Sequence, residues 1–196
     1  MQLIFVTGNE TKVLHAQKAL EDLDIEVVQK KLSLDEPREE DPEEVVLIKA
    51  RQAMREFREP LIVEDSGVFI TALNGFPKTY VHFALDTIGI KGIIKLLTGE
   101  KNRSAEFRQS LAFMSPDMKE PQVFSYTDGG YSVSEKIWTS ESEVSAEFDR
   151  ILIPPGEDKP LCMFSKAWRA RRDTEKNPET IHYRQLARYL SQKQVV

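Results

Sequence analysis

Short runs of apolar residues alternate, in the N-terminal part of the chain, with segments in which apolar residues recur at helical spacing. The runs are typical of strands buried inside a sheet, and the first of them is Leu3-Ile4-Phe5-Val6. After it, Val13, Ala16 and Leu20 recur on one face of a helix predicted over residues 10–22. The predicted strands of this part are residues 3–6, 25–28 and 61–64, followed by an extended run over residues 68–72.

A second helix is predicted after an acidic stretch. Residues Ser33 to Glu44 contain many carboxylates and two prolines, so we expect a loop there. Its last residues, Asp41-Pro42-Glu43-Glu44, provide an N-cap, a proline at the first helical position and a capping-box glutamate. The helix should then continue to about Phe57. The chain therefore begins as a βαβαβ unit.

The pattern beyond residue 72 is weaker and contains more predicted strand. A turn is predicted at Asn74-Gly75-Phe76-Pro77, and a helix over residues 87–98, although two glycines weaken it. Residues 105–114 and 123–133 are predicted strands, the second interrupted at Asp128-Gly129-Gly130, and we expect them to form an antiparallel ribbon that extends the sheet. The last predicted elements are a short strand at residues 151–153 and a helix at residues 181–190.

Length and composition allow one globular domain or two closely packed lobes. The chain has 196 residues, 40% of them hydrophobic, and no repeat or linker divides it, so we expect a single domain over residues 1–196. The net charge of −5 argues against binding to nucleic acid or to an anionic membrane, so any phosphate site has to be local. The single cysteine, Cys162, excludes an intramolecular disulfide, and no apolar stretch resembles a membrane span or a signal peptide. We therefore expect a cytoplasmic protein.

The turn Thr7-Gly8-Asn9, between the first strand and the first helix, is a candidate anion site. Free amides at the start of a helix attract anions, and Lys12 in the first helical turn would be unfavourable there unless an anion were bound. The spacing is not that of the common nucleotide-binding loop. An ordinary turn with a solvated Lys12 is the alternative, and this segment alone leaves the two equally open.

Glu64 and Asp65 are adjacent carboxylates at the end of a buried apolar run, and this position requires a cation. A buried carboxylate without a partner is unfavourable by several kcal/mol. Side chains alternate along a regular strand, so both could face one site only if the backbone departs from β geometry near Gly67, and otherwise one is structural. Together with a polyphosphate, oxygen ligands of this kind favour Mg²⁺. Alternatively, Asp65 caps a turn through Ser66.

Basic residues and histidines add weaker candidates. A basic run near the C-terminus could clamp phosphates, although a solvated helix face is the simpler interpretation. His15 and His82 are interpreted as surface residues, whereas His182 is kept as a candidate. The basic run consists of Lys166, Arg169, Arg171, Arg172 and Lys176.

Three motifs occur in order along the chain. They are Thr7-Gly8-Asn9-x-x-Lys12, Val63-Glu64-Asp65-Ser66-Gly67 and Ala72-Leu73-Asn74-Gly75-Phe76-Pro77. In this order and spacing they resemble the motifs of the inosine/xanthosine triphosphate pyrophosphatase family. The resemblance covers residues 1 to about 115 and becomes weaker in the C-terminal third.

The resemblance implies a fold and an activity. The fold would be α/β and two-lobed, with a long mixed β-sheet flanked by helices and the active-site cleft between the lobes. The activity would be Mg²⁺-dependent hydrolysis of non-standard purine nucleoside triphosphates (ITP, dITP and XTP) to monophosphate and pyrophosphate. The protein would be a homodimer, with a small-molecule substrate and no nucleic-acid or membrane partner.

The resemblance also implies roles for individual residues. Asp65 matches the acid that activates water, and the metal ligands would be Glu36, Glu64 and Asp65. A carboxylate beside Mg²⁺ can orient and deprotonate water, which agrees with the reading from the residues alone. The residues implied in substrate binding are Thr7, Gly8, Asn9, Lys12, Lys49, Ser66, Phe148, Asp149, Lys176, His182 and Arg184.

This chain departs from the family pattern mainly where the base is recognised. Lys78 stands where the family usually has glycine, and Val144-Ser145-Ala146-Glu147 replaces a glycine-rich loop. The family's Ser-His-Arg has become Ile181-His182-Tyr183-Arg184, which displaces the arginine by about 100° around a helix. Two alternatives therefore stay open, namely a pyrophosphatase with altered base specificity and a nucleotide-binding sensor or regulator without turnover.

Overall fold

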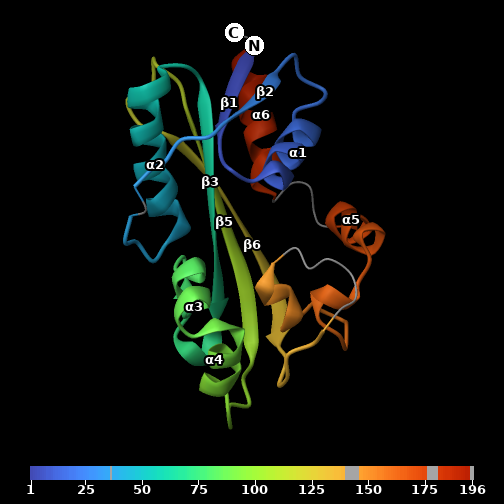
Figure 1. Cartoon of the computed structure of the whole chain (residues 1–196). Coiled ribbons are helices and arrows are strands. Elements are labelled where there is room, and N and C mark those ends of the chain that lie inside the picture. The colour runs from blue at the N-terminus through green and yellow to red at the C-terminus, as the bar shows by residue number, and fades with distance from the viewer. Residues whose placement is uncertain (36, 140–145, 176–180, 195–196) are drawn as a thin grey trace. The chain divides into compact units, whose positions relative to one another are not determined.

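The computed structural model describes residues 1–35, 37–139, 146–175 and 181–194 (Figure 1). The chain forms two compact units, which are described separately. Unit 1 consists of Met1–Ser66, Gln109–Tyr126 and Asn177–Val196, and unit 2 of Gly67–Arg108 and Thr127–Lys176. No helix in the described part of the chain is both long and apolar enough to cross a membrane.

The strands of the described residues form a mixed sheet in the order β2-β1-β3-β5-β6-β7, with β4 paired to β3. β1 is parallel to both β2 and β3, with Ile4 opposite Val28 on one side and Leu61 on the other. β4 and β7 are antiparallel to β3 and β6, respectively. The predicted mixed α/β fold is thus confirmed. The strands are β1 (Gln2–Val6), β2 (Glu26–Lys30), β3 (Leu61–Ile70), β4 (Pro77–Lys78), β5 (Ser104–Met114), β6 (Gln122–Val133) and β7 (Leu152–Ile153).

Helices α1, α2 and α6 belong to unit 1, and α3, α4 and α5 to unit 2. α2 begins where the sequence predicts, because the Asp41 side chain accepts a hydrogen bond from the Glu43 amide at 3.0 Å and Pro42 occupies the first helical position. The helices are α1 (Glu10–Ala19), α2 (Pro42–Phe57), α3 (Val81–Thr87), α4 (Gly89–Leu96), α5 (Lys166–Glu175) and α6 (His182–Gln194), with short 3₁₀ turns at Thr71–Leu73, Glu147–Arg150 and Leu161–Met163.

The core of unit 1 has two halves, one on each face of its strands, because side chains alternate along each strand. Leu3 and Phe5 of β1 face α1 and α6, and pack in one cluster with Tyr183 of α6. Ile4 and Val6 face the other way and pack against α2. In Figure 1, α1 and α6 lie on one side of β1 and α2 lies on the other. The same alternation continues in β3, with Ile62 in the first cluster and Leu61 and Val63 in the second.

Unit 2 has its own core, in which α4 packs against the strands. Ile93 and Leu97 are fully buried there, in one cluster with Ile70, Tyr131 and Phe148. Lys78 lies in the left-handed region with φ +57°, which a non-glycine residue adopts at a cost of about 1 kcal/mol. A glycine at this position would adopt the same conformation without that cost.

Several predicted elements differ from the observed ones. β3 runs without a break through Glu64-Asp65-Ser66-Gly67, where two separate extended runs were predicted. Gly67 is needed there for another reason, since a Cβ atom at this position would lie 2.5 Å from the Lys78 carbonyl oxygen of β4. The helix predicted over residues 87–98 is α4 alone, and α3, which precedes it, was not predicted. β6 is continuous through Gly129 and Gly130.

Candidate active site

The turn between β1 and α1 is closed by its own side chains. The Asn9 carboxamide oxygen accepts hydrogen bonds from the amides of Thr11 at 2.9 Å and Lys12 at 3.3 Å, so Asn9 is the N-cap of α1. The Asn9 amide in turn donates to the Thr7 hydroxyl at 3.1 Å. A Cβ atom added at Gly8 would have nothing within 4 Å. The fold therefore does not require glycine at this position. Because Gly8 has no side chain, the space beside the turn is open.

Glu64 and Asp65 point to opposite faces of β3, because the strand stays regular through both. Glu64 follows the register of Ile62 and faces α1 and α6, where Lys12 and Tyr183 contact it. Asp65 follows the register of Val63 and faces α2, which supplies Lys49. Glu64 is thus paired with Lys12, and Asp65 with Lys49.

Glu64 is an internal anion. Its side chain is only 5% exposed, and one carboxylate oxygen, Oε2, accepts a short hydrogen bond from the Tyr183 hydroxyl. The other, Oε1, lies 3.5 Å from the Lys12 ammonium and 3.8 Å from Nε2 of His182. Burial by itself raises the pKa of Glu64, but the Lys12 charge, His182 and the Tyr183 hydroxyl outweigh it and lower the pKa to about 2. The carboxylate is therefore ionised throughout the physiological range.

The same contacts act on Tyr183 in the opposite direction. Burial and the negative charge of Glu64 both raise the pKa of the phenol far above its ordinary value. The hydroxyl is consequently always protonated and donates to Glu64, and its oxygen also lies 3.3 Å from the Lys12 carbonyl oxygen. Tyr183 thereby connects the start of α6 with the first turn of α1.

Asp65 and Lys49 form an ion pair on the other face of β3. The distance from Lys49 Nζ to Asp65 Oδ1 is 2.9 Å, and the two side chains are 11% and 18% exposed. Asp65 is therefore more accessible than Glu64, and its carboxylate oxygens are the kind of donor that Mg²⁺ binds. Ser66 follows in the same strand and is half-buried.

His182 and Arg184 of α6 lie in different surroundings. His182 is 2% exposed, and neither ring nitrogen has a hydrogen-bond partner in the described part of the chain. Its ring stacks on Tyr126, with the centroids 6.4 Å apart. Arg184 instead donates to the carbonyl oxygen of Ala19 at 3.4 Å, at the C-terminal end of α1. Its guanidinium therefore lies at the opposite end of that helix from Asn9.

Phe148 and Asp149, the predicted base-binding pair, belong to unit 2. Both are buried, and the Asp149 carboxylate forms a 2.7 Å ion pair with Arg169 of α5. Arg169 also donates to the Leu161 carbonyl oxygen at 2.7 Å, so interpreting it as a solvated residue was wrong. Burial and the Asp149 charge both raise the pKa of the Cys162 thiol, which fits a packed, unreactive cysteine.

The predicted metal ligands are Glu36, Glu64 and Asp65. Glu36 and Lys176, predicted as a metal ligand and a phosphate contact, lie outside the described residues. Within the described ranges, no group of three or more histidine, cysteine, aspartate or glutamate side chains is arranged to hold a metal ion. Asp65 fits the donor chemistry, whereas Glu64 is enclosed by other partners. Both assignments stay predictions.

Sequence reasoning overlooked Tyr183 and the pairing of Arg169. Tyr183 was noted only as an interruption of a motif, and nothing local predicts that it contacts Glu64, 119 residues earlier in the chain. The adjacent carboxylates Glu64 and Asp65 did indicate that cationic partners lie nearby, but the sequence did not show which residues these partners are.

Comparisons with known proteins agree with these observations. The sequence profile of the Ham1 family matches residues 3–174. A protein of Methanopyrus kandleri named dITP/XTP pyrophosphatase is 39% identical over 81% of this chain and 81% of its own length. A protein of the same name from Thermococcus kodakarensis is 37% identical over 81% of this chain and 83% of its own length. The solved structure of the Staphylococcus aureus Ham1 protein has a TM-score of 0.77 and 21% identity, over 98% of this chain and all of that one.

Proposed function

Because the chain belongs to the Ham1 family, we propose that it hydrolyses non-standard purine nucleoside triphosphates (dITP, XTP and ITP) to the monophosphate and pyrophosphate. The observation on which this proposal chiefly depends is the identity of 37–39% to two dITP/XTP pyrophosphatases over 81% of the chain. The geometry of unit 1 supports it, since an open glycine turn, two lysines and a partly exposed carboxylate are the groups that such a reaction needs.

The triphosphate is proposed to bind at the start of α1. Thr7, Gly8 and Asn9 form the turn, and Lys12 and Lys49 add positive charge beside β3. The Asn9 side chain already occupies two helix amides, so a phosphate would take over those amides or use the open side of Gly8. Lys176 is a further proposed phosphate contact, and Ser66 a contact to the nucleotide.

Mg²⁺ is proposed as the cofactor, held by Asp65 together with Glu36. When bound, the ion would neutralise phosphate charge and lower the pKa of a coordinated water. Glu64 was predicted as a third ligand, but Tyr183 and Lys12 already contact its carboxylate oxygens, which argues for a different role.

Asp65 is the proposed catalytic residue. A carboxylate beside the scissile phosphate can orient a water molecule and accept its proton, which contributes typically ~10²–10⁴-fold to a rate. The 2.9 Å ion pair with Lys49 fixes one of the Asp65 carboxylate oxygens. The Lys49 ammonium lies 2.9 Å from Oδ1 of Asp65, so it can also stabilise negative charge that develops on the phosphate.

Base recognition is proposed for Phe148, Asp149, His182 and Arg184. Phe148 can stack on a purine, and hydrogen-bond donors read the 6-oxo group. Arg184 contacts the far end of α1, which favours the alternative of an altered base specificity.

We further propose that the protein acts as a homodimer in the cytoplasm, where a lone cysteine stays reduced.

A substrate panel tests the proposal. The purified protein is incubated with Mg²⁺ and ITP, dITP, XTP, GTP, ATP or a pyrimidine triphosphate, and pyrophosphate and monophosphate are measured. We expect turnover of ITP, dITP and XTP, and a loss of at least ~10²-fold in kcat for Asp65→Asn with nucleotide binding largely kept. Exposed Asp22→Asn is the matched control. Tight binding without pyrophosphate from any nucleotide would instead identify a sensor.

A further inference from the structure

We propose that Glu64 and Tyr183 are positioning residues, which hold the Lys12 ammonium in place for the triphosphate, and that Glu64 is not a ligand of the metal ion. The inference rests on the proposed function, because it takes a triphosphate as the ligand of Lys12. All the residues on which it depends belong to unit 1.

The first argument is the geometry around Lys12. Its Nζ donates to the backbone carbonyl oxygen of Glu64 at 3.4 Å and lies 3.5 Å from the Oε1 atom of the same residue. A lysine side chain is long and flexible, and holding it in one position costs about 2 kcal/mol of side-chain entropy. Two acceptors on a single residue of a central strand therefore determine where the ammonium lies. At 24% exposed, the Lys12 side chain remains accessible to a ligand.

The second argument is the geometry around Glu64. Tyr183 donates to Oε2, so the carboxylate cannot rotate and Oε1 stays directed at Lys12. His182 lies against Oε1 at 3.8 Å and is itself 2% exposed, which closes the remaining side. With 5% of the Glu64 side chain exposed, water cannot replace the Tyr183 hydroxyl if it is removed.

The same enclosure argues against a metal ion at Glu64. Mg²⁺ loses its water reluctantly and usually keeps several water ligands, which need space beside the carboxylate. Oε2 is taken by Tyr183 and Oε1 faces a lysine, so neither oxygen offers that space. Asp65, on the other face of β3, is 18% exposed and is the more suitable ligand.

A double-mutant cycle tests the positioning role without any turnover. Binding of inorganic tripolyphosphate to the metal-free protein is measured by calorimetry for wild type, Tyr183→Phe, Lys12→Met and the double variant. We expect Tyr183→Phe to weaken binding about fivefold when Lys12 is present and to have no effect in the Lys12→Met background. An equal loss in both backgrounds would mean that Tyr183 acts through the fold and would overturn the proposal, as would unchanged binding by Tyr183→Phe.

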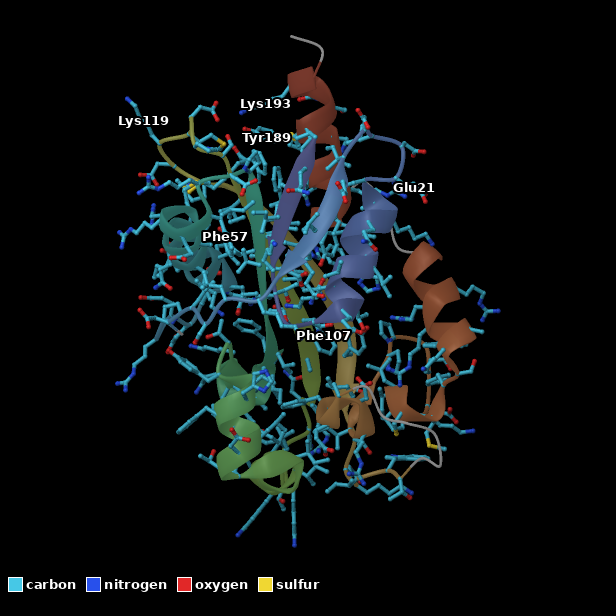
Figure 2. All side chains as sticks on the ribbon, turned by 45° about the horizontal axis from the view of Figure 1, so that its top comes forward. Glu21, Phe57, Phe107, Lys119, Tyr189 and Lys193 are labelled. Carbon is cyan, nitrogen blue, oxygen red and sulfur yellow. The ribbon has the colours of Figure 1, made fainter. Side chains whose placement is uncertain are left out.

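Tyr189→Phe is the matched control, because Tyr189 lies on the same helix (Figure 2). Its ring packs on Phe113 and Phe124. It should bind tripolyphosphate as wild type does. If wild type releases no pyrophosphate from any nucleotide, the proposed function fails, but the binding cycle still decides the positioning role.

A second measurement tests the metal statement. The Mg²⁺ concentration that gives half-maximal turnover of ITP is compared between wild type and Glu64→Gln. We expect it to stay within about twofold while kcat/KM falls, whereas loss of a true metal ligand would raise it by at least ~10-fold. A tenfold rise in Glu64→Gln, against an unchanged value in exposed Glu21→Gln, would show that Glu64 binds the ion.

Discussion

Replacing Glu64 by glutamine is expected to remove an acid-sensitive part of the stability. The pKa of Glu64 is about 2 in the folded protein, against an ordinary value of 4.5. Because the folded-state pKa is the lower one, the ionised carboxylate stabilises the fold above pH 4.5, and this stabilisation disappears as the pH falls through 2. The difference of about 2.5 between the two pKa values corresponds to ~3.4 kcal/mol in the free energy of unfolding at neutral pH.

The pH dependence can be measured by urea unfolding in metal-free buffer, followed by circular dichroism at pH 7 and pH 3. At pH 3 the unfolded carboxyl is mostly protonated and the folded one still mostly ionised, so ~2 of the 3.4 kcal/mol should be lost. Other carboxylates titrate in both proteins and cancel in the difference. The stability gap between wild type and Glu64→Gln should therefore be about 2 kcal/mol smaller at pH 3 than at pH 7.

A gap that stays constant within ~0.5 kcal/mol between the two pH values would refute this reasoning, because the pKa of Glu64 would then be the same in both states. Glu21 provides the control. It is exposed beyond the end of α1 (Figure 2), so Glu21→Gln should follow wild type at both pH values.

Two further predictions concern α1 and α6. Asn9→Ala should lower the free energy of unfolding by about 1 kcal/mol, since the cap on the Thr11 and Lys12 amides is lost, whereas Asn9→Asp should keep the cap and weaken calorimetric binding of tripolyphosphate at least ~5-fold by charge repulsion. Equal binding by Asn9→Asp and wild type would exclude this turn as the phosphate site. Leu186→Ala on α6, at a fully buried position, should cost about 2–5 kcal/mol in urea unfolding, while Leu14→Ala, 63% exposed on α1, should change stability by less than ~0.5 kcal/mol.

The first half of unit 1 could be predicted from the sequence because its signals are local. Consecutive apolar residues define β1, and Asp41-Pro42 defines the start of α2 to the residue. α3 was not predicted because it lacks such local signals: it is short and has no side-chain cap at its start. Helix ends were less predictable, as α1 stops at Ala19 although apolar spacing continues to Leu23.

β3 shows where local reasoning fails. Two adjacent carboxylates indicate the end of a strand, because an unpaired charge cannot stay inside a sheet. The strand nevertheless continues, since Lys12, 52 residues away, and Lys49, 16 residues away, each neutralise one of the carboxylates. Such partners come together only in the fold. Because these partners are not visible in the sequence, it could suggest that either Glu64 or Asp65 is structural, but it could not show which one.

The sequence predicted which residue types occur in the candidate site, but only some of the contacts between them. The strand, glycine turn and helix start gave Asn9 and Lys12 directly, and the apolar run gave Asp65. The contact of Tyr183 with Glu64 and the contact of Arg184 with the Ala19 carbonyl oxygen both depend on how α6 packs against α1. Packing of this kind joins residues far apart in the chain, and one sequence does not determine it.

The pairing around β3 also changes what Lys12 implies. A lysine in the first turn of a helix is unfavourable beside the positive end of the helix dipole, and this made the turn a candidate anion site. The structure supplies that anion from within the chain, as Glu64. Lys12 lies 3.5 Å from Oε1 of Glu64, so its charge is already balanced by a buried carboxylate. The position of Lys12 in the helix therefore does not by itself call for an external anion. The argument for a phosphate at the start of α1 depends instead on the open side of Gly8 and on the accessible Lys12 side chain.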